Sequence, residues 1–353
     1  MCAKVVTTDT SSSKRSLLRD ILKQVSRSFY LTLAVVPANV RDQIGLSYLF
    51  ARAADTIADT DVIERAQRLQ YLKQFRAQFA GEQINWDAIR GIQAALAPHQ
   101  VDSAERILLQ RLEDCFRLYL DCTQDDRIRI RRLMSTLPNG MEMDLSRFHG
   151  DMAKDLTALQ TLDDLDQYTY YVAGCVGEFW TDMTCGHRPA LAQWNVKEMS
   201  AVGVRFGKGL QLTNLLKDLA KDLQRGRCYI PETMLKEAGL APKDLLRADQ
   251  ADAFRPVLRQ LLTIAREHLD QGWLYTMAIP RLEIRLRLSC MWPILFAGET
   301  LRLIARSDEL LNPAVTLKIS RGTVYRIMAL TTLTAASENV ATAYWGWLRK
   351  QIV

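Results

Sequence analysis

Apolar residues recur at intervals of three and four along most of the chain, which is the spacing of one face of an α-helix. Leu17, Ile21, Leu22 and Val25 form one such run. The pattern predicts helices near residues 15–26, 38–59, 62–80, 102–122, 125–148, 164–185, 196–224, 252–276, 282–305 and 319–348. The alternation typical of half-buried strands is essentially missing. We therefore expect an all-α protein.

Breaks in the helical pattern fall at residues 81–100, 186–195, 224–246 and 307–313, and each contains Gly, Pro, Asn or Asp. None of them is long or rich in Ser and Gly, as a flexible interdomain linker is. We therefore expect a single helical domain over residues 15–353, preceded by a flexible tail over residues 1–14.

The composition agrees with long helices and few turns. Gly and Pro together make 27 (17 + 10) of 353 residues, and 48% of the residues are hydrophobic, which is ample for a packed core. Disordered chains, collagen-like chains and small disulfide scaffolds are excluded. The seven cysteines contain no Cys-x-x-Cys pair, so we interpret them as unpaired thiols in a reducing compartment.

The net charge of +6 comes from 46 Lys and Arg against 40 Asp and Glu, with basic and acidic clusters interspersed along the chain. A nucleic-acid binder concentrates its cations on one face or tail, so we expect no nucleic-acid partner. The first residues lack the apolar core of a secretory signal, and the apolar runs are shorter than the roughly 18 residues of a membrane span. We expect a cytoplasmic protein that is soluble or lies peripherally on the inner membrane.

The first acidic motif is Arg52-Ala-Ala-Asp55-Thr-Ile-Ala-Asp59, near the end of a predicted helix with mostly apolar neighbours. Residues four apart share a helix face, with Cβ atoms about 5–6 Å apart. Asp55 and Asp59 therefore direct two carboxylates to one side, and Arg52 lies on that side three residues earlier. For this motif alone, a solvated face near a helix end is the alternative explanation.

The second acidic motif lies in the predicted helix 196–224. Gln211, Asn214, Asp218 and Asp222 are spaced i, i+3, i+7 and i+11, so they form one polar stripe along a helix otherwise rich in leucine. Such a stripe faces water or a shared ligand. If the two acidic helices face each other, their four carboxylates and one amide oxygen make a hard-oxygen site suited to Mg²⁺.

A diphosphate substrate fits between such a metal site and the nearby cations. Mg²⁺ completes its shell with waters and phosphate oxygens, and Arg52, Lys217, Arg225 and Arg227 would meet the remaining phosphate charge. Mg²⁺ also stabilises the leaving charge when an allylic diphosphate ionises. The carbocation left behind needs an apolar cavity with aromatic faces. The residues therefore favour a diphosphate substrate held by a metal on one side and by cations on the other.

A third segment, from Tyr168 to Gly177, places the small residues Ala173, Gly174 and Gly177 inside a predicted helix. Glycine inside a helix costs about 1 kcal/mol relative to alanine. Something must therefore approach closely there, and both a neighbouring helix and a bulky ligand are open explanations.

At these residues the sequence resembles the squalene/phytoene synthase family. The matching motifs are Ser26-Arg27-Ser28-Phe29, Tyr48 to Asp59, Tyr168 to Gly177 and Leu212 to Pro231, in the family's order and spacing. The resemblance spans about residues 20 to 325. Lys318-Ile-Ser-Arg321-Gly322 is more similar to the C-terminal part of squalene synthases than to that of phytoene synthases.

The resemblance implies an isoprenoid-synthase-type helical bundle around a central cavity. It also implies head-to-head condensation of two molecules of farnesyl diphosphate. The first molecule ionises, the second attacks the allylic cation to give cyclopropyl presqualene diphosphate, and a second ionisation with rearrangement and hydride delivery gives squalene. The implied cofactors are Mg²⁺ and NADPH, and we expect a monomer.

The family motifs assign roles residue by residue. The implied Mg²⁺ ligands, which also count as catalytic, are Asp55, Asp59, Asp218 and Asp222, with Asn214 as a further ligand. Tyr168 matches a tyrosine proposed to assist proton removal and to control the cation. The implied diphosphate contacts are Ser26, Ser28, Arg52, Lys217 and Arg227, although Lys217 stands where arginine is frequent. The implied pocket residues are Phe29, Tyr48, Gly174 and Gln211.

An NADPH site does not follow from the residues themselves. No Gly-x-Gly-x-x-Gly motif follows a predicted strand, which a dinucleotide fingerprint requires. If NADPH binds, Lys318 and Arg321 are the candidate partners for its phosphates. Two cations on a solvated helix end are the alternative explanation.

Two other functions remain open at this point. A phytoene or dehydrosqualene synthase would form its product without a reductant. A non-catalytic helical assembly partner would resemble family members that have lost activity, but all four motif aspartates are present in this chain.

Overall fold

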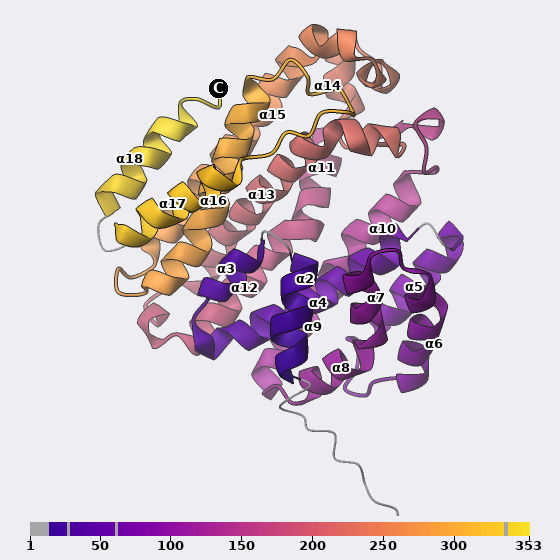
Figure 1. Ribbon diagram of the computed structural model, residues 1–353, viewed down its shortest axis with the longest axis vertical. Helices are drawn as coiled ribbons and strands as arrows, with labels where there is room; N and C mark the ends of the chain where they lie inside the picture. Colours follow the sequence, from indigo (N-terminus) through magenta and orange to yellow (C-terminus); the bar gives the residue numbers. More distant parts are fainter. Residues whose placement is uncertain (1–13, 27–28, 61–62, 335–337) are drawn as a thin grey trace, which may run out of the picture. The chain divides into compact units, whose positions relative to one another are not determined.

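The computed structural model describes residues 14–26, 29–60, 63–334 and 338–353 (Figure 1). The protein is 78% helical, with almost no strand among these residues, and the expected all-α class is confirmed. Contacts divide the chain into two compact units, Met1–Glu142 and Met143–Val353. The boundary falls inside helix α10 (Pro138–Arg147). The single domain over residues 15–353 stays a prediction.

Unit 1 is built around one long helix, α4, with shorter helices before and after it. Its described elements are η1 (Ser16–Ile21), α2 (Leu22–Ser26), α3 (Tyr30–Val35), α4 (Ala38–Asp59), α5 (Arg65–Ala77), α6 (Trp86–Leu96), η3 (Ala97–His99), α7 (Ser103–Gln110), α8 (Leu112–Leu120), α9 (Gln124–Thr136) and the start of α10.

An aromatic cluster forms the centre of unit 1. The ring of Phe50 in α4 lies 4.8 Å from Phe116, 5.0 Å from Phe79 and 6.3 Å from Phe75, centroid to centroid. All four side chains are fully buried. Because Phe50 faces this cluster, α4 keeps a different side, which carries Tyr48 and Arg52, partly accessible to solvent.

The prediction of a break over residues 81–100 is wrong, because this stretch contains α6. Asn85 begins the helix, and its side chain accepts a hydrogen bond from the Ala88 amide at 3.0 Å, which satisfies one of the free N–H groups of the first turn. Ile89, Ile92 and Leu96 then bury one face of the helix. Asn85 therefore starts a helix instead of marking a turn.

Two predicted helices of unit 1 are each divided in two. The helix expected over residues 102–122 is interrupted at Arg111, between α7 and α8. The helix expected over residues 125–148 is interrupted before Pro138, which begins α10. Proline lacks an N–H group and favours the first turn of a helix, so a new helix at Pro138 is the expected outcome.

Unit 2 contains the longest helices. Its described elements are η4 (Ala153–Asp155), β1 (Thr157–Ala158), α11 (Leu162–Thr169), η5 (Tyr170–Gly174), α12 (Cys175–His187), η6 (Pro189–Leu191), α13 (Val196–Gln224), β2 (Arg227–Cys228), α14 (Glu232–Glu237), η7 (Pro242–Leu246), η8 (Ala248–Gln250), α15 (Ala251–Ala278), α16 (Ile284–Ala305), α17 (Arg321–Leu333) and α18 (Glu338–Arg349). Helix α13 packs against α12 and α15 (Figure 1).

Close packing of α12 on α13 accounts for the glycine at position 177. A Cβ atom at Gly177 would lie 2.0 Å from the carbonyl oxygen of Gly203 in α13. No side chain fits there, and the two helix backbones touch. Of the two explanations left open by the sequence, a neighbouring helix is therefore the one that applies to Gly177.

A short parallel pair of strands joins the segment after α13 to the segment before α11. Thr157 is paired with Arg227 and Ala158 with Cys228, and the Leu159 amide donates to the Cys228 carbonyl at 3.0 Å. Gly226 has φ +76°, and a Cβ atom there would lie 2.7 Å from the Met152 carbonyl oxygen. The strand pair and this glycine fix the position of Arg227, although the sequence shows no strand pattern.

The helix expected over residues 319–348 is observed as α17 and α18, on either side of residues 335–337, which lie outside the described residues. Ser320 caps α17 by accepting from the Thr323 amide at 3.0 Å. Helix α18 is held by Glu338, which accepts a 2.6 Å hydrogen bond from the buried guanidinium of Arg287.

Helix α16 is long and apolar enough to cross a membrane by length and composition. Within the protein, 72% of its apolar window is buried. A buried core helix passes the same test, so the apolarity of α16 is accounted for by its packing inside unit 2.

Candidate active site

The first acidic motif forms a polar stripe on α4. Tyr48, Arg52, Asp55 and Asp59 are spaced i, i+4, i+7 and i+11, and all four side chains are partly or fully accessible. The residues between them are mostly buried, including Ala53, Ala54 and the run from Thr56 to Ala58. The expectation that both carboxylates share one face agrees with this arrangement.

Arg52 holds one carboxylate of this stripe in place. Its Nη1 donates to Asp55 Oδ2 at 2.6 Å, and its Nη2 donates to Glu105 of α7. Burial disfavours the charged guanidinium, but the carboxylates of Asp55 and Glu105 outweigh this effect and raise the pKa of Arg52. Both terminal nitrogens of Arg52 donate hydrogen bonds to carboxylates. Its predicted contact with diphosphate therefore stays a prediction. Glu105 is a partner that the sequence did not reveal.

The remaining predicted residues of unit 1 lie before or beside the stripe. Phe29 stacks on Tyr48 of α4 at 5.5 Å between ring centroids and an interplanar angle of 22°. Ser26 is buried, and its hydroxyl donates to the Leu22 carbonyl of its own helix at 2.5 Å. Ser28 lies outside the described residues. The structure therefore brings together an aromatic pair and the acidic stripe on α4.

The second acidic motif forms the corresponding stripe on α13. Gln211, Asp218 and Asp222 are partly accessible and Asn214 is exposed. The leucines that flank them are buried, namely Leu212, Leu215, Leu216, Leu219 and Leu223. Asn195 caps this helix by accepting from the Glu198 amide, and the helix runs without interruption to Gln224. One rigid helix therefore fixes the spacing of all four polar residues.

Lys217 lies beside this stripe and forms an ion pair with Asp218. Its Nζ lies 3.0 Å from Asp218 Oδ2, with the two side chains 30% and 40% exposed. An ion pair at this exposure is weak and easily exchanged. A phosphate oxygen approaching Asp218 together with a metal ion would therefore also find a cation next to it.

Tyr168 belongs to a buried polar cluster in unit 2. Its hydroxyl donates to Asp144 Oδ2 of α10 at 3.1 Å and lies 3.3 Å from the hydroxyl of Tyr229. Tyr229 donates to the same Asp144 oxygen at 3.0 Å, and Arg227 Nη1 lies 3.9 Å from it. We refer to Asp144, Tyr168, Arg227 and Tyr229 as the tyrosine cluster.

Burial governs the titration of both phenols in the tyrosine cluster. Loss of solvent, followed by the charge of Asp144, raises the pKa of Tyr168 well above its usual value. The same two causes raise the pKa of Tyr229. Both phenols are therefore protonated at neutral pH, and each carries one proton to donate.

The sequence pointed to Tyr168 and Arg227 but not to their partners. Asp144 was not among the candidate residues, and Tyr229 follows the candidate Arg227 by two residues. Residue 144 lies in α10, residue 168 in α11 and residue 229 directly after β2, so no local spacing could join them. The acid at position 144, between Met143 and Leu145, was the one available signal.

The other predicted pocket and cofactor residues of unit 2 lie elsewhere. Gly174 packs against α13, where a Cβ atom would lie 3.2 Å from Val204, so helix packing accounts for its size. Lys318 and Arg321 are both exposed, just before and at the start of α17. Their predicted roles at a pocket and at NADPH stay predictions.

The donor set of each stripe fits Mg²⁺ only in part. Carboxylate and amide oxygens are the hard ligands that Mg²⁺ prefers. Over the described part of the chain, however, no three His, Cys, Asp or Glu side chains gather into a group that could hold a metal ion. Mg²⁺ is typically bound by one or two carboxylates plus substrate phosphates. The residues therefore fit a metal ion that arrives with a diphosphate.

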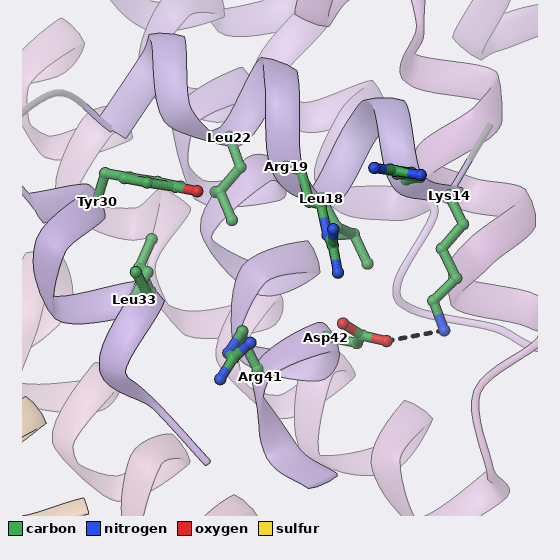
Figure 2. Close-up of a pocket in the computed structure, with 10 residues that line it drawn as sticks. Lys14, Leu18, Arg19, Leu22, Tyr30, Leu33, Arg41 and Asp42 are labelled. Atoms are coloured by element: carbon green, nitrogen blue, oxygen red, sulfur yellow. Dashed lines mark ion pairs between the residues drawn. The ribbon is translucent and has the colours of Figure 1, made fainter. Parts of the chain in front are cut away.

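Unit 1 also contains a basic cavity of about 530 Å³ (Figure 2). Lys14, Arg19 and Arg41 contribute cations, and the Lys14 Nζ pairs with Asp42 at 2.8 Å. None of the predicted site residues that the structure describes lines it. The residues of the acidic motifs therefore do not form this cavity.

Comparison with known proteins identifies the family to which the chain is similar. The family model for squalene/phytoene synthases matches residues 22–323. A bifunctional lycopene cyclase/phytoene synthase of Arthroderma gypseum is 26% identical over 245 residues, which cover 69% of this chain and 39% of that protein. Squalene synthase ERG9 of Saccharomyces cerevisiae is 25% identical over 320 residues, which cover 90% of this chain and 68% of that protein.

The fold is shared with a solved structure described as TcSQS in complex with a ligand. The two chains superimpose with a TM-score of 0.73 at 20% identity, over 98% of this chain and 97% of that chain. Members of the family are isoprenoid synthases that use Mg²⁺ to bind prenyl diphosphates; squalene synthases also use NADPH, and phytoene synthases do not. With its family model covering most of the sequence, the chain belongs to the squalene/phytoene synthase family.

Proposed function

We propose that this protein condenses two molecules of farnesyl diphosphate head to head and reduces the resulting presqualene diphosphate to squalene. The observation that carries the proposal is the pair of polar stripes on α4 and α13, each with two aspartates four residues apart and a cation beside them. The match to the yeast squalene synthase over 90% of the chain supports the squalene product.

The stripe residues divide the work of holding a diphosphate. Asp55 and Asp59 on α4, and Asn214, Asp218 and Asp222 on α13, would hold Mg²⁺ through hard oxygen atoms. When bound, Mg²⁺ stabilises the negative charge that develops on the leaving diphosphate. Lys217 adds positive charge beside the α13 stripe, Arg227 adds positive charge from the strand that follows this helix, and Arg52 keeps Asp55 in its position.

Tyr168 acts after the diphosphate has left. Its buried hydroxyl is held by hydrogen bonds within the tyrosine cluster, so its direction is fixed before substrate binds. A fixed dipole near a developing carbocation stabilises it without reorganisation. Phe29 and Tyr48 supply aromatic faces of the kind that attract cations.

A phytoene or dehydrosqualene synthase is the second candidate, and the 26% identity to a bifunctional phytoene synthase favours it. The two candidates differ in their need for a reductant. We propose that NADPH binds near Lys318 and Arg321, and that the protein works as a cytoplasmic monomer, soluble or peripherally bound to the inner membrane.

Product analysis separates these candidates. Purified protein is incubated with Mg²⁺ and either farnesyl or geranylgeranyl diphosphate, with and without NADPH, and the hydrocarbons are extracted. Squalene formed only with NADPH supports the proposal. Dehydrosqualene or phytoene formed regardless of NADPH would replace it with the second candidate.

A further inference from the structure

The two phenols of the tyrosine cluster share one acceptor atom. Tyr168 and Tyr229 lie within 3.1 and 3.0 Å of Asp144 Oδ2, and their rings are 4.7 Å apart. Each phenol has one proton, and a carboxylate oxygen accepts more than one hydrogen bond. When both protons point to Asp144, the 3.3 Å contact between the two hydroxyl oxygens carries no proton of its own.

The surroundings make this arrangement rigid. Tyr168 and Tyr229 are each 5% exposed, and the Asp144 side chain is 14% exposed. Phe148 packs edge-on against Tyr229 at 5.1 Å, and the strand pair β1–β2 ends directly before Tyr229. The proposed reaction therefore meets a phenol whose proton direction is already set.

Fixing the proton of Tyr168 also fixes its lone pairs. With its O–H directed to Asp144, the hydroxyl oxygen presents its lone pairs away from the carboxylate. An oxygen in this state accepts a proton while passing its own proton on. Arg227 Nη1 lies 3.9 Å from Asp144 Oδ2, and its positive charge favours the charged carboxylate, which is the form that accepts this proton.

We propose that Asp144 is the positioning residue and terminal proton acceptor for Tyr168 in the cyclopropane-forming step, with Tyr229 holding the same carboxylate oxygen from the other side. This inference rests on the proposed function, since it assigns the proton lost when two farnesyl chains join. It gives a role to Asp144, which lies outside the matching motifs, and to Tyr229, to which the resemblance assigned no role.

The step balances as follows. The C–H bond of the joined intermediate breaks, and its electron pair forms the new C–C bond of the cyclopropane ring. The proton passes to the Tyr168 hydroxyl oxygen as the hydroxyl's own proton passes to Asp144 Oδ2. Tyr168 ends neutral, as it began, and the carboxylate ends as a carboxylic acid.

Asp144→Asn tests the proposal because asparagine keeps the shape but removes the proton acceptor. Farnesyl diphosphate and Mg²⁺ are supplied without NADPH, and both the released diphosphate and the prenyl products are measured. We expect condensed product to fall about 100-fold, the usual order for loss of a general base. Diphosphate release should fall far less, with farnesol from water capture making up the difference.

Two further variants complete the test. Asp163→Asn, at an exposed position in the first turn of α11, should keep the wild-type ratio of farnesol to condensed product. Asp144→Glu retains a carboxylate and should restore part of the condensation. An unfolding double-mutant cycle of Asp144→Asn with Tyr168→Phe should show coupling of about fivefold in the unfolding equilibrium constant, whatever the activity.

The outcomes separate this inference from the proposed function. If wild-type protein releases no diphosphate from farnesyl diphosphate, the proposed function fails and the inference falls with it. If wild-type protein condenses the substrate and Asp144→Asn leaves the ratio of farnesol to product unchanged, Asp144 has no part in proton transfer. That result, with coupling still present in the unfolding cycle, would mean that the tyrosine cluster stabilises the fold and takes no part in the reaction.

Discussion

The contact between α12 and α13 gives the sharpest stability prediction. In Gly177→Ala, the new Cβ atom would lie 2.0 Å from the Gly203 carbonyl oxygen and 2.2 Å from its carbon. Unstrained C···O contacts are about 3.3–3.6 Å, so this contact must lengthen by about 1.3–1.6 Å. Overpacking of this kind costs about 1–3 kcal/mol, while alanine regains up to about 1 kcal/mol of helix propensity. We expect a net loss of about 1–2 kcal/mol.

Two other glycines of unit 2, Gly203 and Gly346, provide comparison variants that should rank in stability by the space around the added Cβ atom. In Gly203→Ala, the nearest atom would be the Gly177 carbonyl oxygen at 2.8 Å, so a smaller loss is expected. Gly346 in α18 has nothing within 4 Å of the added Cβ, so Gly346→Ala should gain about 0.5–1 kcal/mol. The expected order of stability is Gly346→Ala, wild type, Gly203→Ala and Gly177→Ala.

Urea unfolding followed by circular dichroism measures this order through the midpoints, provided that the slopes remain equal. The reasoning would be refuted if Gly177→Ala were as stable as wild type, or if Gly203→Ala were the more damaging change. Either result would mean that α12 and α13 are not in backbone contact.

Two other predictions concern the C-terminal helices. Hydrogen bonds from Arg281 and Arg287 lower the pKa of Glu338 below its ordinary value of 4.5. The contribution of Glu338 to folding stability is therefore complete above that pH and is lost as the pH falls through the folded-state pKa. Glu338→Gln should therefore cost about 2 kcal/mol of stability at pH 7, because the buried Arg287 loses a charged partner. The urea midpoint of this variant should approach that of wild type in acid. A difference between the two midpoints that does not change with pH would contradict the ion pair. Lys318→Ala combined with Arg321→Ala should raise the KM for NADPH severalfold without slowing diphosphate release, and an unchanged KM in steady-state assays would remove these residues from the reductant site.

Periodicity predicted the two helices that carry the acidic motifs. Helix α13 is observed over the expected residues 196–224, and α4 over the expected 38–59. Both are long and strongly periodic, and the polar stripes break an otherwise apolar pattern, so the aspartates were visible in the sequence. Local spacing within one rigid helix is a property that a sequence displays directly.

Features that depend on distant partners were not predictable in this way. Helix α6 was missed because Asn85 favours turns and helix N-caps alike. The contact of Arg52 with Glu105 joins two helices, and the tyrosine cluster joins residues 144, 168 and 229. Tertiary packing brings these groups together, and no pattern within a single helix shows it.

The central claim is that the aspartates of each stripe act, together with Mg²⁺, on a prenyl diphosphate. Diphosphate release from farnesyl diphosphate measures this most directly, in wild type, Asp55→Asn, Asp218→Asn and the exposed control Asp252→Asn. We predict Mg²⁺-dependent release by wild type and Asp252→Asn, and a loss of about 100-fold or more in each stripe variant, the order seen when one electrostatic stabiliser is removed. Full release without Mg²⁺, or by either stripe variant, would contradict the claim.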